Sequence, residues 1–190
     1  MKFGIIKERK NPPDRRVVFT PEELVRLQSE HPEAEIKVES SDIRIFSDDQ
    51  YRNLGLNVTA DMSDCDVLFG VKEVPVDALI PNKKYFFFSH TIKKQPYNRK
   101  LLKAILDKNI ELYDHETIVD ATNHRLIGFG RYAGLVGAYN GFRGFGIKYD
   151  LFTLPKAETL SGKEDLIARL KRQTLPNIKI VLTGHGKVGM

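Results

Sequence analysis

The sequence contains a single cysteine and no long hydrophobic run. Cys65 alone cannot form an internal disulfide and offers no cysteine-based metal site. The longest apolar runs, such as "YFFFS", are far too short to cross a bilayer. No signal segment opens the chain, because residues 1–6 lead directly into "KERK". These absences predict a cytoplasmic protein.

The chain also has no continuous stripe of one charge. Its net charge is +5, but the basic residues are spread among acids, as in "KERKNPPDRR" and "SGKEDLIARLKR". Nucleic-acid binding needs a concentrated basic patch, so this pattern argues against a nucleic-acid partner. A pocket that attracts small carboxylates is an equally simple use of the positive charge. The length of 190 residues allows one domain, or one domain and part of another.

Short apolar runs alternate with helix-like stretches. "TPEELVRLQSE" has a complete helix start, with Thr20 as N-cap, Pro21 at the first position and Glu23 completing a capping box. Strands separated by helices at this rhythm predict an α/β fold with a doubly wound parallel sheet. The expected strands cover residues 2–7, 35–40, 66–73, 84–90 and 110–114, and further helices cover residues near 48–54 and 96–108.

Seven of the 14 glycines lie in "GFGRYAGLVGAYNGFRGFG". Gly134, Gly137 and Gly141 are spaced i, i+3 and i+7, so on a helix they form one smooth face that lets another backbone approach closely. A flexible loop is the alternative, but the interleaved aromatic and aliphatic residues favour the helix. A further helix over residues 161–173, capped by Ser161, is expected to follow.

The chain closes on "NIKIVLTGHGKVGM". The apolar run predicts a buried strand, and Gly184, Gly186 and Gly189 have the G-x-G-x-x-G spacing of a dinucleotide-binding turn. In such a turn, backbone amides approach a pyrophosphate at the start of a helix. The helix and the acidic residue that complete the motif would lie beyond Met190. We therefore expect the first strand and phosphate loop of a second, truncated Rossmann domain.

Ionisable residues gather at the ends of three successive predicted strands. Lys72 and Glu73 end one strand, His90 ends the next, and Asp114 and Glu116 end the third. Doubly wound folds bind their ligands at the carboxyl ends of the strands. The sequence therefore predicts the functional site at this edge of the sheet.

Several separate motifs, in order, resemble the amino-terminal region of the alanine dehydrogenase and pyridine-nucleotide transhydrogenase superfamily. They are "FTPEEL" after "DRR", "GVKEVP", "FFFSHTIKKQ" and "FGRYAGLVGAYNGFR". Their spacing most resembles the NAD-dependent, lysine-forming saccharopine dehydrogenases, over nearly the whole chain. The resemblance implies a Rossmann-like (flavodoxin-like) substrate-side domain over residues 1–130 and connecting helices over 131–176. Residues 177–190 would then begin a second domain that binds NAD.

The resemblance assigns the catalytic roles to Lys72 and His90. Lys72 matches the family's active-site lysine, and partial desolvation lets a lysine act as a base. A salt bridge with Glu73 is the plainer interpretation, and the two are compatible. His90 matches the catalytic histidine, a residue type that transfers protons near neutral pH. Without the family match, a histidine after several aromatic residues is more commonly part of the core.

The resemblance also implies substrate-binding and cofactor-binding residues. Arg16 in "DRRVVFTP" matches an arginine that holds a substrate carboxylate, a task suited to a planar guanidinium. On its own Arg16 would be a surface residue, and Arg15 is the more solvent-directed of the two. The other substrate-binding residues are Glu73, Gln95, Glu116 and Arg125, and the cofactor-binding residues are Gly184, Gly186 and Gly189. Glu73 or Glu116 could instead be a plain ion-pair partner.

The implied activity is that of an NAD- or NADP-dependent oxidoreductase of lysine metabolism, which oxidises a secondary amine of an amino acid. The 190 residues alone are expected to be inactive, because most of the cofactor site would be missing. An alanine dehydrogenase-like enzyme is one alternative, although Gln95, Glu116 and Arg125 favour a larger substrate. A non-catalytic ligand-sensing or dimerisation module is the other. The sequence leaves homo-oligomerisation open.

Overall fold

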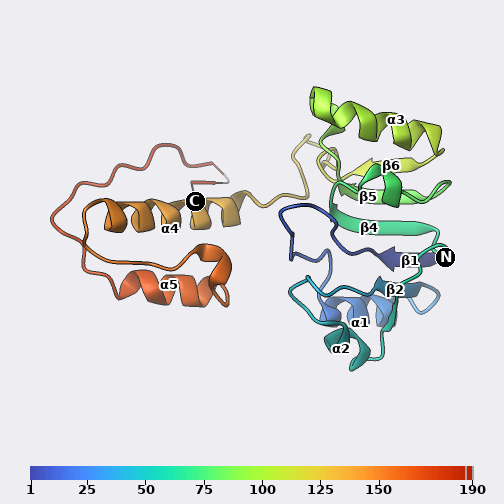
Figure 1. The fold of residues 1–190 in the computed structure, drawn as a ribbon, viewed down its shortest axis with the longest axis horizontal. Coiled ribbons are helices and arrows are strands. Elements are labelled where there is room, and N and C mark those ends of the chain that lie inside the picture. Colours follow the sequence, from blue (N-terminus) through green and yellow to red (C-terminus); the bar gives the residue numbers. More distant parts are fainter. Residues whose placement is uncertain (187, 190) are drawn as a thin grey trace. The chain divides into compact units, whose positions relative to one another are not determined.

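Within the described residues, six parallel strands and three α-helices build the first part of the chain, and two α-helices, α4 and α5 in Figure 1, build the second. The computed structural model describes residues 1–186 and 188–189. The chain divides into two units, Met1–Ile127 and Gly128–Met190.

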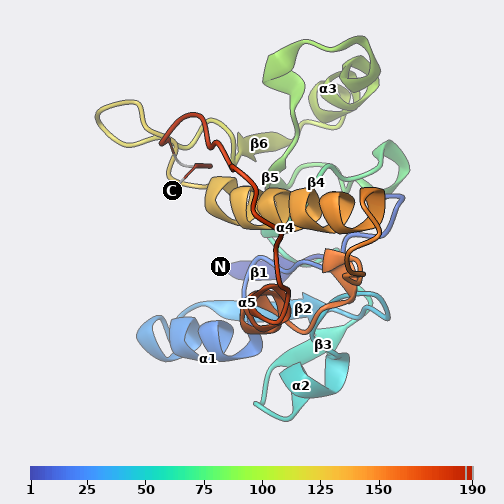
Figure 2. The ribbon, with the colours of Figure 1, turned by 90° about the vertical axis from the view of Figure 1, so that its left-hand side faces the viewer.

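The strands of the first unit form one sheet in the order β3-β2-β1-β4-β5-β6, and every neighbouring pair is parallel. This is the strand order of the Rossmann fold. The predicted doubly wound parallel sheet is therefore confirmed. Figure 1 shows the order from β6 to β2, and Figure 2 shows β3 beyond β2. The strands are β1 (Lys2–Ile5), β2 (Glu35–Glu39), β3 (Asn57–Thr59), β4 (Val67–Lys72), β5 (Lys84–Phe88) and β6 (Glu111–Asp114).

Capping residues fix the starts of two helices in this unit. The Thr20 side chain accepts a hydrogen bond from the Glu23 amide at 3.2 Å, and the Glu23 carboxylate accepts one from the Thr20 amide at 2.8 Å. The predicted capping box is therefore confirmed. Ser47 and Gln50 form the same reciprocal pair. The helices are α1 (Pro21–Glu30), α2 (Asp48–Arg52) and α3 (Arg99–Asp107), with 3-10 turns η1 (Val76–Ala78), η2 (Thr91–Lys93) and η3 (Pro96–Asn98).

The sheet separates two apolar cores. On one face Leu68 and Tyr85 pack with residues of α3 such as Leu101. On the other face Leu24 of α1 packs in a cluster that includes Phe69. Neighbouring residues of a strand point to opposite faces, which explains why Leu68 and Phe69 of β4 join different cores. Helices therefore cover both faces of the sheet, as a doubly wound fold requires.

β4 contains a β-bulge just before its carboxyl end. Phe69 pairs with Phe86 of β5, but Lys72 pairs with Phe88, so three steps along β4 match two along β5. An extra residue in one strand bends it and changes the direction of the side chains that follow. The bulge therefore sets the direction in which Lys72 leaves the sheet.

The glycine-rich segment of the second unit forms a helix of 19 residues, α4 (Gly130–Lys148), as predicted. It lies beside α5 (Lys163–Lys171) in Figures 1 and 2, with the 3-10 turn η4 (Ala157–Thr159) between them in sequence. Buried Tyr139 and Leu166 join the two helices in one apolar cluster. The second helix was expected over residues 161–173 with Ser161 as its cap, but Gly162 is the N-cap.

Close backbone approach on α4 is confirmed at only one of the three predicted glycines. A Cβ added at Gly134 would lie 2.0 Å from the carbonyl oxygen of Val188. Within the described residues, nothing lies within 4 Å of a Cβ added at Gly137 or Gly141. Gly146 is a second close approach, which the spacing does not indicate.

The strand expected in "IKIVLT", residues 178–183, is not formed. A strand needs a neighbour for its backbone N–H and C=O groups. None of the described strands pairs with this segment, and its side chains are exposed, with Val181 at 73% and Leu182 at 76%. The prediction is therefore wrong for these residues, because an apolar run alone does not supply a pairing partner.

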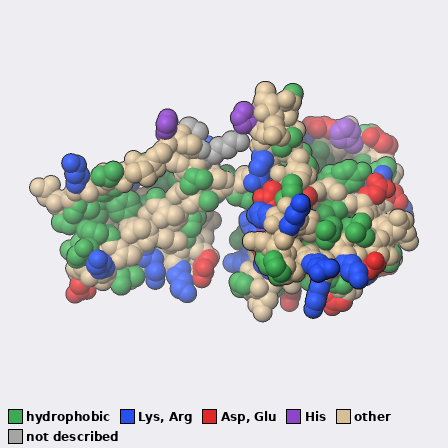
Figure 3. Space-filling model, turned by 90° about the horizontal axis from the view of Figure 1, so that it is seen from above, with side chains coloured by type: hydrophobic (Ala, Val, Ile, Leu, Met, Phe, Trp, Pro, Cys, Tyr) green, Lys and Arg blue, Asp and Glu red, His purple; other side chains and the backbone are tan. Residues whose placement is uncertain are grey.

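The described residues contain no helix that could span a membrane, and the face seen in Figure 3 has no region of a single charge over the first unit. Every helix formed by residues 1–186 and 188–189 is too short or too polar to cross a membrane. On the face seen in Figure 3, basic and acidic side chains are intermixed over the first unit.

Candidate functional site

Three neighbouring strands end in side chains that the sequence singles out. Lys72 is the last residue of β4, His90 follows β5 and Glu116 follows β6. These three parallel strands are neighbours in the sheet, so their carboxyl ends share one edge. The structure therefore places Lys72, His90 and Glu116 at the edge where doubly wound folds bind ligands.

Glu116 lies among basic groups. Its Oε2 is 3.2 Å from Nδ1 of His90, and its Oε1 is 3.3 Å from Nζ of Lys93 and 3.4 Å from Nη1 of Arg125. Burial acts to raise the pKa of Glu116, but its bonds with His90 and Lys93 and the charge of Arg125 outweigh burial and hold that pKa below its usual value. An ionised Glu116 thus draws an imidazole, an ammonium and a guanidinium together.

The imidazole of His90 has a donor and an acceptor beside the same nitrogen. Nδ1 is 3.1 Å from Nζ of Lys93 and 3.2 Å from Oε2 of Glu116. A neutral ring can accept a hydrogen bond from Lys93, and a protonated ring can donate one to Glu116. Each protonation state therefore has a partner, and Nε2 has none among the described residues. This arrangement suits a group that gains and loses a proton.

A buried carboxylate fixes the segments that carry His90 and Glu116. Asp114 is 6% exposed, and its Oδ2 accepts a hydrogen bond from the buried hydroxyl of Ser89. Its Oδ1 accepts one from the amide of Glu116 at 2.8 Å. His90 itself has a φ of 57°, and its carbonyl oxygen accepts a bond from the Asn98 amide group at 3.1 Å. One carboxylate therefore ties the end of β5 to the end of β6.

Arg16 lies in the loop between β1 and α1, where Asp14 orients it. Nε of Arg16 is 2.9 Å from Oδ1 of Asp14, and Nη2 bonds to Oδ2. The bonds with Arg16 lower the pKa of Asp14, and the charge of Lys72 adds to this effect. The charge of Arg16 also acts on Glu8, whose carboxylate accepts a hydrogen bond from the Lys72 amide at 2.8 Å. Arg16 and Lys72 therefore share one electrostatic environment.

Glu73 pairs with Lys10 and not with Lys72. Nζ of Lys10 is 2.6 Å from Oε1 of Glu73, whereas the buried Oε2 has no partner among the described residues. Burial acts to raise the pKa of Glu73, but the Lys10 bond and the charge of His90 outweigh burial, and the pKa lies below its usual value. A cavity of about 300 Å³ borders this pair, and its lining includes Arg9, Tyr97 and Lys100.

Gln95 is one predicted site residue that the structure does not join to His90 or Glu116. It is exposed and precedes η3. Among the described residues, no hydrogen bond connects its side chain to His90 or Glu116. Its assignment to the substrate therefore stays a prediction from the family motif.

The three glycines predicted to bind a cofactor form a tight turn in the second unit. Gly184 has a φ of +82°, a conformation that favours glycine. The amide of Gly189 donates to the carbonyl oxygen of Gly186 at 2.9 Å, and a Cβ added at Gly189 would lie 2.7 Å from the carbonyl oxygen of Gly184. Glycine is therefore required at both ends of the turn.

The sequence motifs do not indicate four charged residues of the site. Lys93 follows His90 by three residues, so a helical turn predicted over these positions would have placed the two side chains in contact. Asp14 is likewise only two residues from Arg16. Glu8 and Lys10, however, meet Lys72 and Glu73 across more than 60 residues, and only the folded sheet shows these pairs.

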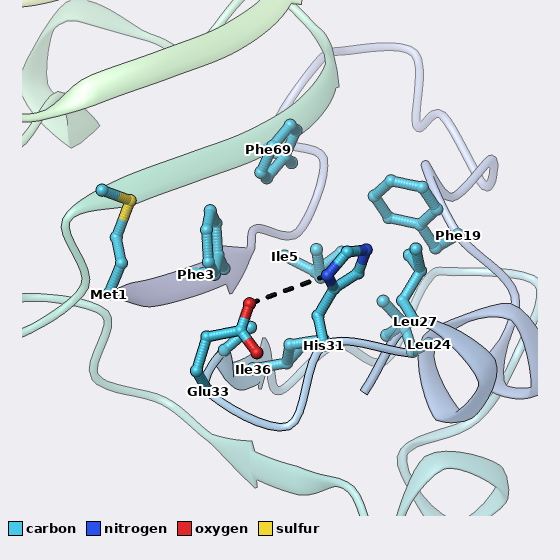
Figure 4. A pocket seen from close by; sticks show the side chains of 11 residues that line it. Met1, Phe3, Ile5, Phe19, Leu24, Leu27, His31, Glu33, Ile36 and Phe69 are labelled. Atoms are coloured by element: carbon cyan, nitrogen blue, oxygen red, sulfur yellow. Dashed lines mark ion pairs between the residues drawn. The ribbon is translucent and has the colours of Figure 1, made fainter. Parts of the chain in front are cut away.

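A larger cavity, of about 520 Å³, is an apolar groove over β1, β4 and α1 (Figure 4). Its walls include Phe3, Phe19 and Phe69, and its polar groups include the ion pair of His31 with Glu33 at 3.6 Å. No lysine or arginine occurs among the described residues that line it. The groove therefore lacks the cations that an amino-acid carboxylate would require, and we place the candidate site at the strand ends.

The strand order defines a Rossmann-like α/β domain, and the ionisable groups at the carboxyl ends of its strands mark a candidate ligand site. Residues 4–136 match the family described as "Alanine dehydrogenase/PNT, N-terminal domain". The chain belongs to this family, and the resemblance seen in its motifs is confirmed.

Two relatives indicate the branch of the family. The "Alpha-aminoadipic semialdehyde synthase" of Arabidopsis thaliana is 30% identical over 209 residues, which cover 98% of this chain and 20% of the relative. The NAD(+)-dependent, L-lysine-forming saccharopine dehydrogenase of Candida glabrata is 29% identical over 182 residues, which cover 93% of this chain and 45% of the relative. The chain thus spans less than half the length of either protein.

Two solved structures share the fold. A transhydrogenase from Sinorhizobium meliloti matches with a TM-score of 0.60 at 18% identity, over 83% of this chain and 48% of that one. An L-alanine dehydrogenase matches with a TM-score of 0.56 at 20% identity, over 78% and 41% respectively. These likenesses confirm the Rossmann-like architecture.

Proposed function

We propose that this chain supplies the substrate-binding side of an NAD(P)-dependent dehydrogenase that oxidises a secondary amine of an amino acid. The saccharopine dehydrogenase of Candida glabrata, matched over most of this chain, supports the reaction class. The arrangement of His90, Glu116 and Arg125 is the observation that carries the proposal. It combines a proton-transfer group with a cation at the carboxyl edge of the sheet.

Arg16 and Arg125 are proposed to hold substrate carboxylates. Each guanidinium can present two N–H groups to one carboxylate. Both have acidic partners within the protein. Nε of Arg16 is 2.9 Å from Oδ1 of Asp14, and Nη1 of Arg125 is 3.4 Å from Oε1 of Glu116. These partners orient the guanidinium groups, and in this proposal an incoming carboxylate binds to the oriented groups.

His90 and Lys72 are proposed to move protons to and from the substrate nitrogen and the departing amine. The two partners of Nδ1 leave the Nε2 side of His90 for the substrate. Among the described residues, no hydrogen bond or ion pair occupies the Lys72 ammonium. Lys72 is therefore available to the ligand, while Glu73 is neutralised by Lys10.

The nicotinamide cofactor would accept the hydride when bound. The tight glycine turn fits part of a pyrophosphate site, because side chains at Gly184 or Gly189 would disturb the turn. The backbone amides of this turn would approach the phosphates. We propose that the 190 residues alone reduce no NAD, because the cofactor-binding residues assigned to them are limited to this glycine turn.

Isothermal titration of the 190-residue chain tests the substrate class. A saccharopine-type site is expected to bind 2-oxoglutarate and L-lysine more tightly than pyruvate. Arg125→Met should weaken 2-oxoglutarate binding more than pyruvate binding, because it removes one carboxylate partner. A preference for pyruvate would favour the alanine dehydrogenase-like alternative. Binding of neither ligand would contradict the assignment of this site to a 2-oxo acid.

A further inference from the structure

The backbone of β4 departs from regular strand geometry where it presents Lys72. In a regular strand, successive N–H groups point to opposite sides. The amides of Val71 and Lys72 instead donate to one carboxylate, that of Glu8, at 2.7 Å and 2.8 Å. The backbone is therefore turned between these two residues, in agreement with the register shift that β4 shows against β5.

Glu8 takes the place of a missing neighbouring strand. β1 ends at Ile5, and the Ile6 amide makes the last bond to β4, 2.9 Å from the carbonyl oxygen of Phe69. Beyond that point, the Glu8 side chain accepts the bonds that a strand backbone would otherwise accept. Glu8 is only 7% exposed, so it provides these two acceptors within the protein interior.

His115 supports the same bulge from the side of β6. Its Nε2–H donates to the carbonyl oxygen of Gly70 at 3.1 Å, and the ring packs against Phe88 with its centroid 5.2 Å away. Three successive residues of β4, at positions 70–72, are thus held by two buried side chains, one from the segment after β1 and one from the residue after β6. Lys72 is the last residue of this held segment.

We propose that Glu8 is a positioning residue for Lys72, which it directs toward the substrate by holding the β4 bulge. This inference rests on the proposed function for the role of Lys72. The clamp itself, by which we mean the hydrogen bonds from the Val71 and Lys72 amides to Glu8, does not depend on that function. Glu8 touches no reacting atom. Its two hydrogen bonds fix the backbone at Val71 and Lys72, so the Cα–Cβ bond of Lys72 leaves the sheet in one direction.

The charges around Glu8 provide a spectroscopic test. Burial raises the pKa of the Glu8 carboxyl, the charge of Asp14 acts in the same direction, and the Val71 and Lys72 amides and the charge of Arg16 act against it. Protonation removes a charged acceptor from both amides. The amide proton resonances of Val71 and Lys72 should therefore shift together, with one midpoint above the usual glutamate value of about 4.3.

The experiment combines this pH titration, by NMR on the labelled 190-residue chain, with calorimetric binding of 2-oxoglutarate. Glu8→Gln keeps the side-chain size but replaces one acceptor with an amide donor. It should abolish the shared titration and weaken 2-oxoglutarate binding about tenfold. Glu22→Gln removes an equal charge at an exposed position of α1 and should change neither measurement.

Each result separates the clamp from the proposed function. If the amide proton resonances of Val71 and Lys72 in the wild-type chain do not titrate with one common midpoint, the role of Glu8 is overturned. This outcome applies even if Glu8→Gln fails to fold. Unchanged ligand affinity in a folded Glu8→Gln variant would also overturn it. A wild-type chain that shows the common step but binds no 2-oxoglutarate would instead count against the proposed function and leave the clamp supported.

Discussion

Two carboxylates at the end of β6, only two residues apart, have different tasks. Asp114 is buried and bonds to the Ser89 hydroxyl and a backbone amide, so it organises the chain. Glu116 pairs with His90, Lys93 and Arg125, so it holds these three basic side chains together. At the scale of single residues, the site depends on this division between groups that hold the backbone and groups that face the ligand.

Arg16 should contribute geometry as well as charge to carboxylate binding. Arg16→Lys keeps the charge but loses the planar pair of donors, so we expect 2-oxoglutarate binding to weaken about tenfold. Arg16 is exposed, and the thermal midpoint should change little. Arg15→Lys is the matched control and should leave affinity unchanged. Equal affinities for both variants, measured by calorimetry, would count against Arg16 as a carboxylate ligand.

His115 should make stability depend on pH. Burial lowers its pKa, so the folded protein binds the proton less readily than the unfolded chain does. The free energy of unfolding should therefore rise with pH up to about pH 6.5 and fall as the solution is acidified below it. His115→Gln keeps a donor for Gly70 but does not titrate, so this part of the pH dependence should disappear.

Thermal midpoints at about pH 5 and pH 7 measure the effect of His115. The midpoint should change less between the two values in His115→Gln than in the wild type. His124→Gln is the control, because that histidine is 71% exposed and should behave like the wild type. If the thermal midpoint of His115→Gln changes with pH as much as that of the wild type, a group other than His115 causes the pH dependence of stability.

The sequence predicts where the candidate site residues lie in the fold better than it predicts their contacts. Lys72 and His90 lie at the ends of predicted strands and Glu116 follows another, and a parallel sheet places such residues at one edge. The partner of Glu73 was the less predictable part, because its neighbour in sequence is Lys72 but its partner in the fold is Lys10. Such a pairing depends on how loops return to the sheet, which local pattern does not encode.

At the scale of elements, the apolar runs with helices between them become strands of the sheet. β1, β2, β4, β5 and β6 all lie within predicted segments. β3 was not predicted, because three residues, Asn57–Thr59, are too few to show an alternating pattern. Residues 178–183 show the opposite case, in which a strongly apolar run lacks a neighbouring strand. Strand propensity thus requires a pairing partner before it becomes structure.

The glycines of α4 should respond differently to alanine according to their surroundings. A Cβ at Gly146 would lie 2.5 Å from both the ring and the carbonyl oxygen of Phe152. Gly146→Ala should therefore destabilise the second unit by about 1–3 kcal/mol. At Gly144 nothing described lies within 4 Å of an added Cβ, so Gly144→Ala should stabilise the helix by up to about 1 kcal/mol.

Chemical denaturation of the two glycine variants provides the comparison. The expected result is a lower midpoint for Gly146→Ala and a midpoint equal to or above the wild type for Gly144→Ala. If both substitutions raise the midpoint, the contact between Gly146 and Phe152 does not limit the packing of this helix.

At the scale of the whole molecule, the chain joins a complete parallel sheet to a unit that ends in a glycine turn. The first unit contains all the proposed substrate and proton-transfer residues, from Arg16 to Arg125. The second contains the three glycines proposed to face a cofactor. This division matches a dehydrogenase in which substrate recognition and cofactor recognition belong to different domains, and it supports the proposed function.

The central claim is that Arg16, Lys72 and His90 form one site for an amino-acid or 2-oxo-acid carboxylate. Titration of 2-oxoglutarate into the isotopically labelled chain, followed by NMR, tests it most directly. We predict that signals of these three residues and of Glu116 shift together along one saturating curve, while those lining the groove at Phe3 and Phe69 stay unchanged. Shifts confined to that groove, or separate curves for Arg16 and His90, would contradict a single site at the strand ends.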